Sequence, residues 1–152
     1  MKVFRLSKKK YAKELSGKGA SKSENRWNSK GTEIIYTSES RALAMSEILV
    51  HVSLATLPSD FVMMTIDVPD TIKIDELKIS ELAENWNQHP PTIGTQKIGD
   101  SFIDSMKYCI LKVPSAVVKE DFNYLLNPNH KDFKKIKIIQ TTDFPFDRRI
   151  FK

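Results

Sequence analysis

The order of apolar and polar positions along this chain predicts short strands and helices that follow one another irregularly. Runs rich in β-branched residues predict strands, and the apolar spacing of residues 95–105 predicts a helix. We expect strands at residues 2–6, 33–37, 61–68, 108–113 and 136–140. Residues 72–77 are expected to continue or pair with the third strand, and residues 79–86 to form a short helix. This mixture without regular strand–helix alternation predicts an α+β fold in a single compact domain.

The remaining helix is expected to start at Ser38 or Ser40, either of which can cap it, and to continue to about Ala55. Its apolar residues cover nearly the whole circumference, which predicts a helix buried on most sides. Glu47 interrupts this apolar surface. An unpaired carboxylate there would cost several kcal/mol, so Glu47 must be paired, protonated or exposed to a polar cleft. An ion pair with His51 and a catalytic role both remain open.

Loops are expected where small and polar residues gather. Residues 16–30 are rich in Ser, Gly, Lys and Asn, and residues 123–130 have the composition of a turn. A loop at residues 89–91 and a tail at residues 143–152 complete the expected order.

Composition sets broad limits on the protein. Its 152 residues fit one domain with one core, and no apolar run approaches the ~20 residues of a membrane helix. The single cysteine, Cys109, lies in an apolar run and is expected to be a small buried hydrophobe. With no signal segment at the start, the expected location is cytoplasmic. The net charge of +5 indicates, weakly, an anionic ligand or partner.

Three residues supply complementary chemistry at similar spacing. Arg26 precedes Tyr36 by ten residues, and Tyr36 precedes Glu47 by eleven. A cation for phosphates, an aromatic face and an acid are the groups needed to hold and split a dinucleotide such as NAD. Simpler roles remain open: Arg26 stacked on an exposed Trp27, and Tyr36 in the core.

Two further residues are candidates. Arg5 stands among apolar neighbours in the first strand, so its charge needs a partner or a ligand. Ser115 follows a predicted strand end and can be a simple turn serine or a hydrogen-bonding residue of a site. No cluster has metal-ligand spacing, and neither a phosphate-binding loop nor a Rossmann fingerprint is present.

Taken together, these residues resemble the RES domain family, and the whole chain, residues 1–152, is expected to be one such domain. Several motifs in order carry the resemblance. They are Phe4-Arg5-Leu6, Gly17-Lys18-Gly19-Ala20, Arg26-Trp27-Asn28 with Gly31, Tyr36-Thr37, Ala42-Leu43-Ala44 with Glu47 and His51, Ile98-Gly99-Asp100, Val113-Pro114-Ser115-Ala116-Val117-Val118, Asn123, Asn127-Pro128 with His130, and Phe146-Asp147 with Arg149.

The resemblance implies a fold and a function. RES proteins resemble ADP-ribosyltransferases in fold and are toxins of bacterial type II toxin–antitoxin pairs. They consume NAD by breaking its nicotinamide–ribose bond with water or phosphate, without a metal, and one lineage transfers ADP-ribose to a protein. The implied partner is an antitoxin with an Xre-type helix-turn-helix, with a homodimer as an option inside the complex. The resemblance implies neither membrane association nor direct nucleic-acid binding.

The family's residues match positions in this chain one by one. Arg26, Tyr36 and Glu47 match its arginine, tyrosine and glutamate as catalytic residues, and Ser115 matches its serine. Arg5, with Arg26, Tyr36 and Ser115, is expected to bind NAD.

One departure is visible. Glu24-Asn25 stand where the family usually has a glycine before the Arg-Trp pair. Two rivals follow from the charge and this departure: a nucleic-acid-binding module or toxin ribonuclease, and an inactive member that only binds an antitoxin.

Overall fold

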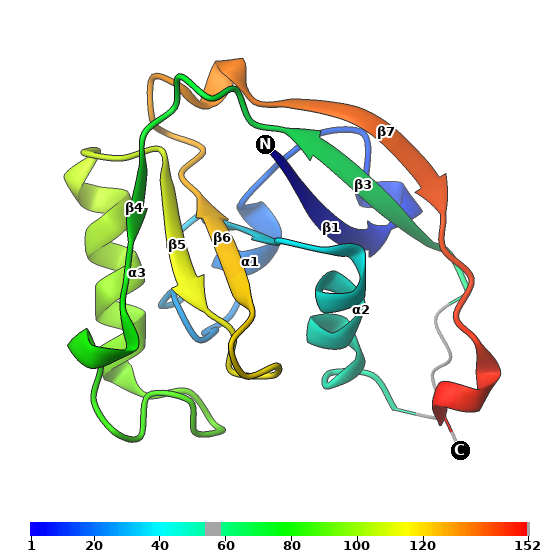
Figure 1. Ribbon diagram of the computed structural model, residues 1–152, viewed down its shortest axis with the longest axis horizontal. Helices are drawn as coiled ribbons and strands as arrows, with labels where there is room; N and C mark the ends of the chain where they lie inside the picture. The colour runs from blue at the N-terminus through cyan, green and yellow to red at the C-terminus, as the bar shows by residue number, and fades with distance from the viewer. Residues whose placement is uncertain (54–58, 152) are drawn as a thin grey trace.

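A twisted β-sheet forms the frame of the protein in the computed structural model, which describes residues 1–53 and 59–151 (Figure 1). In this described part the sheet has seven strands in the order β4-β5-β6-β2-β1-β3-β7. Neighbours are antiparallel except β4 and β5, which are parallel. The strands are β1 (Lys2–Lys8), β2 (Ile35–Ser38), β3 (Phe61–Asp67), β4 (Ile74–Glu76), β5 (Ile110–Pro114), β6 (Phe122–Leu126) and β7 (Lys137–Asp143).

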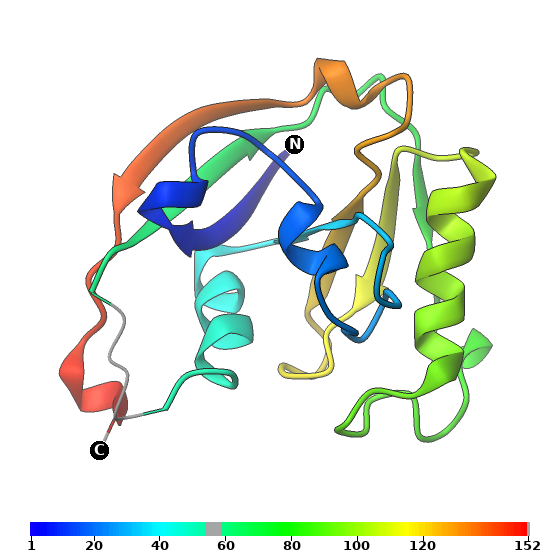
Figure 2. The same cartoon turned by 180° about the vertical axis from the view of Figure 1, so that it is seen from behind.

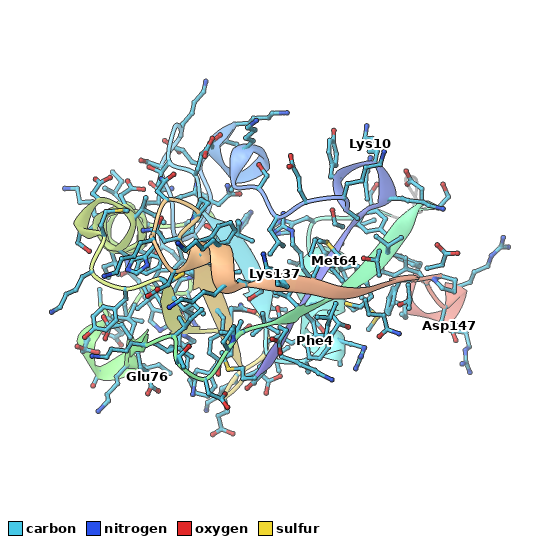
Figure 3. The ribbon with its side chains drawn as sticks, turned by 90° about the horizontal axis from the view of Figure 1, so that it is seen from above. Phe4, Lys10, Met64, Glu76, Lys137 and Asp147 are labelled. Atoms are coloured by element: carbon cyan, nitrogen blue, oxygen red, sulfur yellow. The ribbon has the colours of Figure 1, made fainter. Side chains whose placement is uncertain are left out.

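The sheet is divided at its middle because β1 and β2 pair only at Phe4 and Ser38. Strands β4, β5, β6 and β2 lie on one side of this junction, and β1, β3 and β7 lie on the other (Figure 1). Glu76 of β4 and Asp147 after β7 mark opposite ends of the long axis, with Phe4 between them (Figure 3). The strands therefore diverge beside Phe4 and Ser38.

Helices cover the sheet on either side of the junction. Helix α2 (Arg41–Leu49) packs against β1 and β2. Helix α3 (Ile93–Ser105) places Phe102 and Ile103 in one apolar cluster with side chains of β5 and β6, and Figure 2 shows it from the other side. The shorter elements are α1 (Lys18–Ser21) and the 3-10 turns at Lys9–Tyr11, Ile79–Glu81, Phe133–Lys135 and Arg148–Phe151.

Capping fixes where the two longer helices begin. The Ser40 hydroxyl accepts a hydrogen bond from the Leu43 amide at 3.1 Å, and the Thr92 hydroxyl accepts one from Thr95 at 3.3 Å. Helix α3 ends at Met106, whose φ of 55° is left-handed. Ser40, one of the two expected caps, is therefore the cap of α2, and α3 begins two residues before the predicted position.

The prediction that the helix after Ser40 is long and mostly buried was wrong. It ends at Leu49, and of its residues only Leu43 and Ala44 are fully buried. Its other faces border a cleft and solvent, and Val50 just beyond it is 58% exposed. The expected end near Ala55 lies outside the described residues.

Three further element predictions need correction. Residues 74–76 form β4, which pairs with β5 and not with the 61–68 strand. Only Ile79–Glu81 is helical within 79–86, as a single 3-10 turn. Residues 123–126, predicted to be part of a turn region, belong to β6 in the interior of the sheet. The asparagines and proline of the turn that follows concealed this strand, whose Leu125 and Leu126 are fully buried.

The α+β class is confirmed, and so is the burial of Cys109. The Cys109 side chain is 2% exposed, unpaired and held in the central apolar cluster. Burial raises its thiol pKa to about 11. Among the helices of the described residues, none is long and apolar enough to cross a membrane.

Candidate active site

A cleft of about 920 Å³ opens where β1 and β2 diverge. Its size lies within the ~300–1,000 Å³ range of sites for small molecules and cofactors. The walls come from β1, β2, α2 and three loops near residues 19–27, 87–91 and 116–117. Arg5, Arg26, Tyr36 and Glu47, all predicted site residues, line it.

Glu47 enters the cleft from α2 with one carboxylate oxygen firmly held. The Ser115 hydroxyl donates to its Oε1 at 2.7 Å, and Asn123 Nδ2 donates to the same atom at 2.6 Å. Its Oε2 accepts no hydrogen bond from a described residue. The ion pair with His51, considered from the sequence, is absent among the described residues. Glu47 is thus a hydrogen-bonded carboxylate at the edge of the cleft.

Ser115 lies behind Glu47 and not on the cleft wall. Its side chain is 5% exposed, and its oxygen accepts hydrogen bonds from the amides of Val117 at 3.1 Å and Val118 at 3.0 Å. Its only hydroxyl proton goes to Glu47. The geometry therefore connects Ser115 to the cleft through the Glu47 carboxylate.

Asn123 is a site residue to which the sequence assigned no role. It stands on β6, directly opposite Ser38 of β2, and its Oδ1 accepts a hydrogen bond from the Ser38 hydroxyl at 2.7 Å. A signal was available, because Asn123 belongs to the motifs that carry the family resemblance and asparagine is depleted in strands. That signal required β6 to be recognised as a strand.

Arg26 borders the cleft and holds a neighbouring loop. Its Nη1 donates to the carbonyls of Trp86 and Gln88, each at 3.0 Å. Burial lowers its pKa, while the nearby Glu47 charge acts in the opposite direction. The guanidinium remains charged at neutral pH. Its Nε and Nη2 make no hydrogen bond with any described residue.

The alternative of Arg26 stacked on an exposed tryptophan was wrong. Trp27 is 2% exposed, and its ring packs against that of Trp86 with centroids 6.2 Å apart. Arg26 and Trp27 therefore both hold the loop that contains Trp86 and Gln88. Arg26 binds the backbone carbonyls of that loop, and Trp27 packs against its indole ring.

Tyr36 contributes to the cleft wall and also braces the Arg26 loop. Its hydroxyl donates to Asn28 Oδ1 at 2.6 Å and accepts from the Trp27 amide at 3.2 Å. Burial raises the pKa of Tyr36, so the phenol is neutral at physiological pH. With the hydroxyl engaged, the ring is the part available to a ligand.

Arg5 is a cation in the cleft without an acidic partner. Its Nη1 donates to the Tyr36 carbonyl at 2.8 Å, and no carboxylate of a described residue lies within 4 Å. Burial lowers its pKa. A desolvated guanidinium with unused donors is suited to an anionic ligand.

The loop before Trp27 does not need the glycine that Glu24-Asn25 replace. Asn25 does not adopt a positive φ. Its side-chain amide donates to the carbonyls of Ala20 at 3.1 Å and Ser23 at 3.3 Å. These hydrogen bonds hold the loop without a glycine, and the exposed Glu24 adds a negative charge at the cleft.

Two further motif residues, His130 and Asp100, lie outside the cleft lining and form hydrogen bonds within the protein. His130 is 9% exposed, its Nδ1 accepts from the Asp132 amide at 3.1 Å, and it does not line the cleft. Asp100 of α3 accepts hydrogen bonds from both the amide and the hydroxyl of Ser29, at 3.0 and 2.5 Å. Among the described residues, no group of three or more His, Cys, Asp or Glu side chains could hold a metal ion.

Comparisons with known proteins give one family. The RES domain family matches residues 2–147. The chain is 38% identical over 152 residues to Toxin Res of Photorhabdus laumondii, covering 99% of this chain and 97% of that protein. It is 34% identical over 143 residues to the Prs ADP-ribosylating toxin of Sphingobium sp., covering 93% and 89%.

A solved structure has the same fold. One chain of the crystal structure of the M. tuberculosis MbcT–MbcA toxin–antitoxin complex superposes with a TM-score of 0.75 at 18% identity. The match covers 95% of this chain and 84% of that chain. At this identity the similarity concerns the fold alone.

Proposed function

Since this chain belongs to the RES domain family, we propose that it is a toxin that consumes NAD by breaking the nicotinamide–ribose bond. The observation that carries this proposal is the placement of Glu47. Its carboxylate is held through one oxygen in a cleft that also contains Arg5, a cation without an acidic partner among the described residues. NAD has an anionic pyrophosphate and a cationic nicotinamide ring that leaves as neutral nicotinamide, so its cleavage needs both charges.

We assign roles by the chemistry of each side chain. Arg26 and Arg5 bind the pyrophosphate with the guanidinium donors that the protein leaves unused. The ring of Tyr36 packs on the nicotinamide-ribose end. Glu47 stabilises the positive charge that develops on the ribose as nicotinamide leaves. Ser115, predicted from the sequence to contact NAD, acts in this proposal by holding Glu47, because its proton is already donated there.

The proposed reaction is a substitution at the ribosyl carbon that bears nicotinamide. The bond from C1″ to the nicotinamide nitrogen breaks, and its electron pair leaves with nicotinamide. An oxygen of the acceptor then forms a bond to C1″, and its proton passes to solvent. Water as acceptor gives ADP-ribose, and phosphate gives its 1″-phosphate.

A protein acceptor is the second candidate. The name of the Sphingobium relative, an ADP-ribosylating toxin, favours it. Both candidates share the first bond-breaking step, so both need Glu47. They differ in where the ADP-ribose goes: into solution or onto a protein side chain.

The partner that we propose is an antitoxin, and the location that we propose is the cytoplasm, where NAD is available. The complex of the M. tuberculosis proteins supports an antitoxin by analogy of fold. An Xre-type helix-turn-helix in that partner, and a homodimer of this chain inside the complex, remain predictions from the resemblance.

The test is NAD loss with purified wild type beside Glu47→Gln, with products identified by mass spectrometry. We expect wild type to consume NAD, and the variant to be slower by a factor of about 10² to 10³, the usual effect of removing one electrostatic group. Free nicotinamide with ADP-ribose or its phosphate names the small-molecule acceptor. A mass increase on one protein of a lysate names a protein acceptor.

The control is Glu76→Gln on β4, an exposed carboxylate at one end of the molecule (Figure 3). It should retain the wild-type rate. Folded, antitoxin-free wild type that leaves NAD intact would refute the proposal, and salt-sensitive binding of RNA or DNA in that sample would support the nucleic-acid rival.

A further inference from the structure

We propose that Ser38 and Asn123 form a relay that orients the Glu47 carboxylate and directs its Oε2 toward the substrate. Both residues border the cleft, and we assign them as positioning residues because their side-chain hydrogen bonds lead to the Glu47 carboxylate. This inference rests on the proposed function for its kinetic consequence, while the relay itself can be observed without any turnover.

The relay is a chain of short hydrogen bonds through side chains that are nearly inaccessible. Ser38 donates to Asn123 Oδ1 at 2.7 Å, and Asn123 Nδ2 donates to Glu47 Oε1 at 2.6 Å. Ser38 is 4% exposed and Asn123 is 8% exposed. Water competes poorly for such buried groups, so each bond depends on its protein partner.

Donor and acceptor chemistry determines the orientation of the Asn123 amide. An ionised carboxylate only accepts, so the amide must present its NH₂ to Glu47. Its oxygen then points the other way and needs a donor, which the Ser38 hydroxyl supplies. Without that hydroxyl, the buried oxygen would be unsatisfied and the amide would lose the partner that fixes its rotation.

Strand pairing supplies the rigidity of the relay. Ser38 and Asn123 are direct partners across β2 and β6. Ser38 is also the residue at which β2 pairs with Phe4 of β1. The relay therefore starts where three strands meet, and it is anchored on the part of the sheet that forms the cleft.

Both donors to Glu47 reach the same oxygen. Ser115 and Asn123 each donate to Oε1, which fixes the rotation of the carboxylate and leaves Oε2 without a partner among the described residues. A carboxylate anchored this way keeps its free oxygen at one place, which is the preorganisation that electrostatic catalysis requires.

The first test compares Asn123→Ala with Asn123→Asp. We expect Asn123→Ala to lower kcat for NAD consumption about 10- to 100-fold with KM nearly unchanged, the effect of losing one hydrogen bond to a charged group. Asn123→Asp keeps the shape but replaces the donor with an acceptor of the same charge as Glu47. It should therefore be slower than Asn123→Ala. The control is Asn129→Asp at an exposed position, which should match the wild-type rate.

The second test examines the coupling between Ser38 and Asn123. Ser38→Ala should lower kcat, Ser38→Thr should restore much of it by returning a hydroxyl, and Ser38→Ala with Asn123→Ala should be no slower than Asn123→Ala alone. Equal activity of Asn123→Asp and wild type, or multiplicative effects in the double variant, would overturn the relay.

The third test is independent of activity. In NMR spectra of the wild type, the two Asn123 side-chain amide protons should be resolved and protected from exchange, and Ser38→Ala should remove that protection. If wild type does not consume NAD, the proposed function fails and this spectrum still decides the relay. An Asn123 amide that exchanges freely in the folded wild type would reject it, even if a kinetic variant fails to fold.

Discussion

Arg26 uses different atoms of one guanidinium to bind the protein backbone and, in our proposal, the ligand. Its Nη1 holds the carbonyls of Trp86 and Gln88, while Nε and Nη2 remain for an anion. A planar group with five donors allows this division, and an ammonium with one nitrogen does not. In this proposal, Arg26 couples ligand binding to the position of the loop at 87–91 that lines the cleft.

This division of donors leads to a prediction for Arg26→Lys. Lysine keeps the positive charge but cannot hold two carbonyls and a pyrophosphate together, so we expect KM for NAD to rise about 10-fold or more. Steady-state kinetics would measure this rise. Arg148→Lys, at an exposed position in the C-terminal turn, is the matched control and should not change KM. An unaltered KM in Arg26→Lys would remove Arg26 from the pyrophosphate site.

The Arg26 loop is irregular, yet helix α3 holds it tightly. An ideal Cβ on Gly99 would lie 1.6 Å from the Trp27 carbonyl oxygen, so glycine is needed for the helix to approach this backbone. One residue on, Asp100 accepts two hydrogen bonds from Ser29. The motif Ile98-Gly99-Asp100 therefore positions the loop, which explains how a segment without regular structure presents Arg26 in a defined place.

The close contact makes Gly99→Ala a sharp test of this element. The new methyl group should push α3 and the loop apart, with a loss of about 3 kcal/mol or more in the free energy of unfolding. Urea denaturation would measure it. Gly94→Ala lies in the same helix, where the nearest atom is 3.7 Å away, and should be neutral or stabilising by up to ~1 kcal/mol. Equal stabilities of the two variants would contradict the contact.

Across the whole molecule, the cleft exists because the two parts of the sheet share a single residue pair between β1 and β2. Arg5 of β1 crosses this junction with its hydrogen bond to the Tyr36 carbonyl of β2. A ligand bound to Arg5 on one side and to Glu47 and Arg26 on the other would hold both parts together. Ligand binding should therefore be visible as a gain in global stability.

We expect NAD to stabilise the Glu47→Gln variant, which should bind NAD without rapid turnover. At ten times Kd, binding contributes about 1.4 kcal/mol, or a rise of roughly 3–6 °C in Tm. Differential scanning fluorimetry would measure it. Adding Arg5→Met should abolish most of the rise, whereas adding Arg148→Met should not. A full rise in the Arg5→Met double variant would show that Arg5 does not contact NAD.

Local sequence patterns were sufficient to predict several strands and to single out Glu47. Each strand with a continuous apolar run was predicted, because burial on both faces leaves a clear signal in the sequence. Glu47 was found because a carboxylate in an apolar helix is costly without a partner. Strand β6 was missed because its five residues run directly into the Asn-Pro-Asn turn at 127–129. The end of α2 was missed because it depends on what the helix faces.

The sequence by itself determined the α+β class, the family and the residues Arg5, Arg26, Tyr36 and Glu47 as candidates, because each depends on residue type and short-range order. Only the tertiary structure decided that Ser115 lies behind Glu47, that Asn123 binds the same oxygen, and that Ser38 supports Asn123. Those contacts join residues that are 68 to 85 positions apart. Strand register brings such residues together, and local spacing in the chain does not encode it.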